Sequence, residues 1–185
     1  AETLLETQAN EGAFTFTFDS ALEAGIYRIR IERKNLFLVL DGKESNIQIK
    51  GDLNTINNQN FEITGAPLTK DFNEIMADFA QTRDIPSVTA KIKEINPLVA
   101  SMVMVNVFGP KGEFADMHIS ASERLNASYA GSAIAKNYSE LAVNLQKSHA
   151  RKMASEKIRV GADAPEIAMP NPDGEIMKLS DLKGK

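Results

Sequence analysis

The side chains able to do chemistry in this chain are two histidines, carboxylates, hydroxyls and lysines, because cysteine is absent. Without cysteine there is no thiol nucleophile, disulfide, Cys-ligated zinc or iron–sulfur cluster. His118 stands in a loop or at a helix start, and His149 stands near the C-terminus of an expected helix. Their separation matches no metal-ligand spacing, and an imidazolium near a helix C-terminus interacts favourably with the helix dipole. We therefore expect both histidines to be structural.

A local basic strip is the strongest candidate for binding an anionic ligand. It consists of Arg28, Arg30, Arg33 and Lys34. Acidic residues such as Glu32 stand within the same stretch, which favours a solvated face of mixed charge.

The aromatic stripe Phe14, Phe16 and Phe18 has the spacing of a base-stacking platform. Such a platform needs interleaved basic residues, and Thr15 and Thr17 occupy those positions instead. We expect the three rings to form the core face of a strand.

No other pattern carries catalytic chemistry. The segment Gly109–Gly112 lacks the spacing and the Lys-Ser/Thr ending of a phosphate-binding loop. No carboxylate stands isolated in an apolar run, where its pKa would be raised for acid–base work. The sequence therefore predicts no catalytic, cofactor-binding or metal-binding residue, and a carboxylate-dependent hydrolase or isomerase is kept only as a third alternative.

Composition narrows the class of protein further. A net charge of −4 gives no general attraction to nucleic acid or to an anionic membrane. The apolar content of 43% is that of a globular chain. The uncharged stretch from Ile95 to Pro110 is shorter than the roughly 20 apolar residues of a membrane span.

Most of the first 65 residues alternate apolar and polar side chains as strands do. Residues 36–40 instead form a continuous apolar run of strand length, so we expect both faces of this strand to be covered. Five short strands are predicted, with a Gly-containing turn at Asp41–Gly42, and they imply an antiparallel sheet or small sandwich. The expected strands cover residues 14–18, 27–31, 36–40, 46–50 and 61–64.

After Gly65 the apolar spacing becomes helical. One helix carries Phe72 and Phe79 with Thr69 as its N-cap, and a shorter one carries Val88 and Ile92. The apolar segment 98–108 is expected to be a buried helix, with a strand as the alternative because of its valines. A longer helix over about 132–152 follows. The fold class is therefore predicted to be α+β, with a β-rich part followed by a helical segment.

The last 27 residues contain too many prolines and glycines for a helix. Residues 166–169 and 175–178 are expected to be two strands joined by a turn at Pro172–Gly174. A two-stranded ribbon has little to pack on by itself, so this tail is interpreted as the beginning of a further domain.

The motifs of this tail resemble the opening of thioredoxin-like proteins, in particular the TlpA-like and AhpC/TSA-like thiol–disulfide oxidoreductases. The matching residues are Gly161-Ala162-Asp163-Ala164-Pro165, Asp173-Gly174, and Leu179-Ser180-Asp181-Leu182-Lys183-Gly184-Lys185. In that family these motifs precede the Trp-Cys-x-x-Cys redox motif. The resemblance implies an extracytoplasmic redox protein, and none of its redox residues can be carried over to a chain that has no cysteine.

The front of the chain is similar to a β-rich domain of unknown function that precedes the thioredoxin domain in secreted or lipid-anchored proteins of some Gram-negative bacteria. The resemblance rests on Gly25-Ile26-Tyr27-Arg28-Ile29, the run 36–40, Ile47-Gln48-Ile49-Lys50-Gly51-Asp52 and Phe61-Glu62-Ile63-Thr64-Gly65. Together the resemblances imply a β-rich domain over 1–66, a helical segment over 67–157 and the start of a truncated thioredoxin-like domain over 158–185.

The expected function is that of a non-catalytic accessory region that positions the redox domain, contributes to dimerisation or presents substrate. The expected partners are its own thioredoxin-like domain, a second copy of the chain or a substrate protein, with no cofactor. The expected location is the periplasm or the outer membrane, attached only through a lipid anchor removed ahead of Ala1. The alternative is a free-standing binding or structural lipoprotein module with no redox role.

Overall fold

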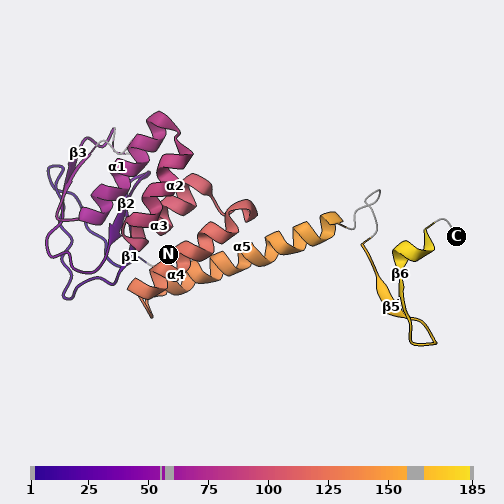
Figure 1. Ribbon diagram of the computed structural model, residues 1–185. Coiled ribbons are helices and arrows are strands. Elements are labelled where there is room, and N and C mark those ends of the chain that lie inside the picture. Colours follow the sequence, from indigo (N-terminus) through magenta and orange to yellow (C-terminus); the bar gives the residue numbers. More distant parts are fainter. Residues whose placement is uncertain (1–2, 55, 57–60, 158–164, 184–185) are drawn as a thin grey trace.

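The computed structural model describes residues 3–54, 56, 61–157 and 165–183 (Figure 1). Strands come first, helices follow, and a short ribbon stands at the end, which confirms the α+β prediction. The strands are β1 (Gly25–Ile31), β2 (Lys34–Leu40), β3 (Gln48–Gly51), β4 (Phe61–Thr64), β5 (Ala168–Pro170) and β6 (Ile176–Lys178). The helices are α1 (Pro67–Thr82), α2 (Ile85–Glu94), α3 (Pro97–Val103), α4 (Ala115–Ser128) and α5 (Ala133–Lys157), with short turns η2 (Met104–Phe108), η3 (Gly112–Phe114) and η4 (Leu179–Leu182).

The β-rich part consists of two antiparallel hairpins around one core. β1 pairs with β2 across a two-residue turn at Glu32 and Arg33, and β3 pairs with β4. Because side chains alternate along a strand, each hairpin turns one apolar row inward. The shared core contains Leu36, Leu38, Leu40, Ile56 and Ala66, with Tyr27, Ile29, Ile31, Ile49 and Ile63 packed against it. The arrangement resembles the predicted small sandwich more than a single sheet.

The strand expected at residues 14–18 is absent, which corrects the first strand prediction. Among residues 3–24 the only backbone ladder contact is an isolated bridge between Asn10 and Ala13. Phe14 and Phe18 remain 38% and 41% exposed, so the aromatic stripe does not form the core face that we expected. The alternation gives the segment a strand pattern, but no neighbouring strand is present to pair with it.

The turn predicted at Asp41–Gly42 is confirmed, with a positive φ at Gly42, and it leads from β2 toward β3 of the other sheet. The expectation that β2 is covered on both faces needs correction. Phe37 is 47% exposed, so β2 is covered on both faces only near its end, where Val39 is fully buried.

Thr69 joins the β-rich part to the helices. The expected N-cap role is wrong, because α1 begins at Pro67 and Thr69 lies in its first turn. Its hydroxyl accepts a hydrogen bond from Val39 N at 2.9 Å and donates one to Val39 O at 3.0 Å. Since Thr69 is fully buried, these bonds fix the start of α1 against the outer edge of β2.

The start of α1 also depends on a glycine. Gly65 has φ +78°, and a Cβ built there would lie 1.9 Å from the carbonyl oxygen of Asn46. Any other residue would have to displace that backbone, so only glycine fits the junction between β4 and the helices.

The second and third helices both begin at a side-chain cap. Asp84 accepts a bond from Ser87 N at the start of α2, and Asn96 accepts one from Leu98 N at the start of α3. α3 continues into the π-helical turn η2, which ends at Gly109 with φ +67°. The buried helix expected over 98–108 is thus confirmed.

Two features of the helical part were not predicted. α4 was missed, and α5 runs five residues beyond the expected end at Lys152, as far as Lys157. The helices share an apolar core with Val39 of β2. Its fully buried members include Leu98, Val99, Val103, Met104 and Leu125.

The C-terminal ribbon has the predicted form. β5 and β6 pair antiparallel around a turn in which Gly174 has φ +85°. Asn171 Oδ1 accepts bonds from Asp173 N and Glu175 N, which closes the turn. No helix among the described residues is long and apolar enough to cross a membrane.

Candidate functional site

Two polar side chains among the described residues, Thr69 and His118, are completely buried, and His118 lies in the first turn of α4. Nδ1 lies 2.8 Å from the hydroxyl of Tyr138 on α5, and Nε2 lies 3.0 Å from the carbonyl oxygen of Gly109. A carbonyl only accepts, so Nε2 carries a hydrogen and donates it to Gly109. With Nε2 as the donor to Gly109, we assign the tautomer in which the Tyr138 hydroxyl donates to Nδ1.

This cluster is closed to chemistry. Both ring nitrogens of His118 are used, and Tyr138 is almost entirely buried. Burial raises the pKa of the Tyr138 phenol above its ordinary value of 10.0, which keeps the hydroxyl protonated as the donor. The histidine therefore ties α4, α5 and the Gly109 turn together, as its expected structural role requires.

His149 also packs structurally. It lies on α5 against Gly112, where an added Cβ would come within 2.9 Å of the ring Nδ1. It stands eight residues before the end of α5, so the helix-end dipole proposed for it is too distant to act on it. No group of three or more His, Asp or Glu side chains within the described part of the chain could hold a metal ion.

The basic strip is spread over an exposed surface of the β1–β2 hairpin. Arg28, Arg30 and Arg33 are exposed, and Arg30 Nε donates to the carbonyl of Glu32 at 3.2 Å. Lys34 donates instead to the carbonyl of Leu53. The strip is thus a solvated hairpin surface that carries positive charge along β1.

The C-terminal ribbon exposes a dense group of apolar side chains. Met169 is 64% exposed and Ile176 is 62% exposed. Their apolar neighbours Ile167, Met177, Leu179 and Leu182 are exposed as well. The helical and β-rich cores include none of these side chains. An apolar surface of this density on a two-stranded ribbon is typical of an element that packs on a partner.

The ribbon is nevertheless well formed. Ser180 N donates to Glu166 Oε1 at 3.1 Å, and the hydrogen bonds from Ser180 lower the pKa of the Glu166 carboxyl. Asp181 Oδ2 accepts from Lys178 N at 3.1 Å. Side-chain caps therefore hold the ribbon and η4 in one shape while their apolar side chains remain uncovered.

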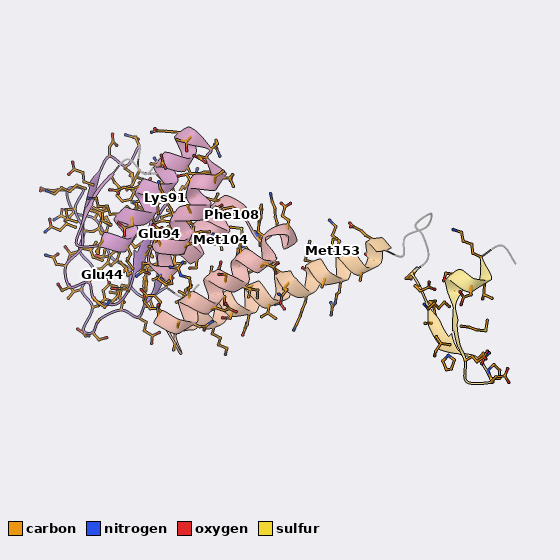
Figure 2. All side chains as sticks on the ribbon, in the orientation of Figure 1. Glu44, Lys91, Glu94, Met104, Phe108 and Met153 are labelled. Carbon is orange, nitrogen blue, oxygen red and sulfur yellow. The ribbon has the colours of Figure 1, made fainter. Side chains whose placement is uncertain are left out.

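α5 has two halves with different surroundings. Ala135, Tyr138, Ala142 and Leu145 of its first half are buried against the helical core. From Gln146 to Glu156 every side chain is exposed except the half-buried His149. Figure 2 shows Met153 on this second half, beyond the body that holds Met104 and Phe108. The second half is thus a polar arm that leaves the helical core.

A shallow depression on α5 is lined by Ser139, Glu140, Val143, Asn144 and Lys147. All five residues come from one helix, so no second element faces a molecule bound there. Ser139 already bonds Ser122 Oγ at 2.9 Å and Asn126 Nδ2 at 2.5 Å. This depression offers no arrangement for chemistry.

Sequence reasoning missed the partner of His118 and the extent of the exposed arm. Tyr138 was noted only as part of an apolar helix face, and nothing in its spacing links it to a histidine 20 positions earlier on another helix. The polar composition after Leu145 was the available signal for the arm. Comparisons with known protein families, curated proteins and solved structures find no match for this chain.

Proposed function

We propose that this chain is the non-catalytic accessory region of an extracytoplasmic, thioredoxin-like thiol–disulfide oxidoreductase. The observation that carries the proposal is the formed but uncovered ribbon of β5, β6 and η4, to which the Asp173-Gly174 and Leu179–Lys183 parts of the resemblance belong. Residues 161–164 and 184–185, which also take part in the resemblance, lie outside the described residues. A ribbon with six exposed apolar side chains is stable when a larger sheet covers it. A thioredoxin-like domain of the same protein supplies that sheet.

The polar arm of α5 supports a positioning role. A helix that is polar on every side is typical of a solvent-exposed connection between domains. Residues 146–156 extend roughly 16 Å at 1.5 Å per residue. Lys152 and Glu156 form an i,i+4 ion pair on this arm, which favours the helix over a loose linker. In this proposal the helical core holds the arm, and the arm sets the distance to the redox domain.

The redox chemistry itself belongs to the partner domain. Thiol–disulfide exchange needs an attacking thiolate and a resolving thiol, and this chain contains no cysteine. In this proposal the chain acts by positioning that domain.

Intact mass and thiol counting on the protein isolated from its native cells test the proposal. We expect a species larger than 20.3 kDa by about 15 kDa, the mass of one added domain of roughly 130–140 residues, with at least two reactive thiols. A native species of 20.3 kDa without thiols would overturn the redox role and leave a free-standing binding module.

A second measurement on that full-length protein tests the docking of the ribbon. Ile176→Lys places a charge on the uncovered face, and Leu4→Lys makes the same change at an exposed leucine far from the ribbon in sequence. We expect Ile176→Lys to lower the thermal midpoint of the redox domain and Leu4→Lys to leave it unchanged. Equal midpoints for both variants would show that nothing packs on the ribbon.

A further inference from the structure

The outer edge of β1 carries backbone N–H and C=O groups that form no hydrogen bond with another described residue. Because the N–H and C=O of Val39 both bond the Thr69 hydroxyl, these two backbone groups point away from β1. The backbone N–H and C=O of Ile26, which pairs with Val39, therefore point away from β2. Because hydrogen-bonded and non-hydrogen-bonded pairs alternate along an antiparallel ladder, the same holds for Arg28 and Arg30. No backbone hydrogen bond joins these three residues to any other described element.

The apolar face along this edge is incomplete. Tyr27, Ile29 and Ile31 point into the core of the β-rich part, yet each is only half-buried. On β2, the leucines that face the same core, Leu36, Leu38 and Leu40, are buried. The difference lies on the side of β1 where the sheet has no further strand, so one more strand with apolar side chains would complete this face.

The geometry points to residues 14–18 of a second copy of this chain as that strand. The segment alternates three phenyl rings with two threonines and has no strand partner of its own. With Thr17 opposite Arg28 in antiparallel register, Phe18, Phe16 and Phe14 come opposite Tyr27, Ile29 and Ile31. The rings then cover the incomplete face, and the threonines lie beside the arginines on the solvent side.

Charge favours this occupant over a second β1. The sequence of β1 contains two arginines and no acidic residue, so β1 paired with its own copy would place like charges side by side. The segment 14–18 is uncharged, and Asp19 directly after it falls diagonally across from Arg28 in the register above. Glu11 precedes the segment, so it carries only negative charge at its flanks.

The path of the chain favours exchange between copies. The carbonyl oxygen of Glu23 accepts a hydrogen bond from the Tyr27 hydroxyl at 2.7 Å. The carbonyl oxygen of Leu22 lies so close to Gly42 that a Cβ built on Gly42 would be only 2.7 Å from it. Residues 22–24 therefore continue alongside the Asp41–Gly42 turn. Since residues 22–24 continue the line of β1, Leu22 lies six positions beyond Arg28. Thr17 is only five positions before Leu22, so a chain that also has to reverse cannot bring Thr17 opposite Arg28 of the same copy. Exchange of identical segments is a common route to symmetric dimers.

Two substitutions at one position test this pairing. The N–H of Arg28 points away from β2, so Arg28→Pro removes an edge donor without breaking a bond of the β1–β2 ladder. Arg28→Thr removes the charge and keeps the donor. We expect wild type and Arg28→Thr to sediment as a dimer at high concentration, and Arg28→Pro to raise the dissociation constant by about tenfold or more. Equal urea midpoints of the diluted monomers would confirm that both variants fold.

Introduced cysteines separate exchange from pairing within one copy. The chain has no native thiol, so Thr17→Cys and Arg28→Cys proteins mixed under mild oxidation report only the new pair. We expect a cross-linked heterodimer from this mixture and none when Gln146→Cys replaces Arg28→Cys. A monomer at all concentrations, or a cross-link formed only within a doubly substituted chain, would overturn the proposal. Neither result bears on the thiol count that tests the redox role.

Discussion

The pair formed by His118 and Tyr138 shows how one buried hydrogen bond can hold two helices in register. α4 and α5 contact each other along small residues, and Ser122 and Ser139 add a second polar contact at 2.9 Å. No buried side-chain nitrogen or oxygen among the described residues is left without a partner. Removing one member of such a pair leaves the other unsatisfied, which costs more than the bond itself contributes.

We expect Tyr138→Phe to lower the free energy of unfolding by about 1–3 kcal/mol at pH 7, because His118 Nδ1 loses its donor. Urea denaturation measures this loss. Tyr129→Phe is the matched control, since Tyr129 bonds Asn96 at a half-buried position and should cost less. Equal losses in the two variants would contradict the special role of the buried pair.

The stability of the wild-type protein should also depend on alkaline pH through Tyr138. Burial raises the folded-state pKa of this phenol, so above pH 10 the unfolded chain loses the proton first. The folded state then binds more protons, and stability falls with rising pH by up to about 1.4 kcal/mol per unit. Tyr138→Phe lacks this contribution, so its stability deficit should narrow between pH 9 and pH 11. A constant deficit across that range would disprove the linkage.

At the scale of elements, apolar patterns predicted most strands and helices, and the exceptions have physical reasons. β1, α1 and α2 were predicted from regular apolar spacing, and β2 was predicted from a continuous apolar run. α4 was missed because its buried face consists of Ala115, His118, Ala121, Ser122 and Leu125, which are mostly small or polar. The segment 14–18 shows the opposite case, since a clear strand pattern gives no strand where the neighbouring strand is missing.

The C-terminus of α2 offers a test at this scale. Arg124 of α4 donates to the carbonyl of Ile92, and to that of Ile95 at 2.7 Å, where the helix leaves carbonyls unpaired. We expect Arg124→Gln to lower the free energy of unfolding by about 1.5–3 kcal/mol, as lost bonds to a charged donor do. Arg151→Gln on the exposed arm is the control and should change stability by less than about 0.5 kcal/mol. A small effect for Arg124→Gln would show that water replaces the guanidinium.

The whole molecule combines two cores of different size with two exposed extensions. The helical core and the core of the β-rich part meet at β2, where Val39 faces the helices and Leu38 faces the other sheet. The sequence predicted the order of these parts from the change of apolar period. It could not predict which surfaces stay uncovered, because burial depends on contacts between segments far apart in the chain.

Amide hydrogen exchange along α5 should report this division. Amides of residues 137–145 lie on the buried half and should exchange only on global unfolding. Amides from Ala150 onward lie on the arm and should exchange at least about a hundredfold faster, because local fraying exposes them. Uniform protection along α5 would contradict the exposed arm.

The arm of α5 also has a mechanical consequence. Because a helix is stiff, the distance between the end of the arm and Leu145, the last buried residue of α5, is nearly constant. Small changes in packing at that pivot, around Ala142 and Tyr138, translate into large sideways displacements at the tip. The packing of Tyr138 and Ala142 therefore sets the direction of the arm, although these two residues lie at the opposite end of α5 from its tip.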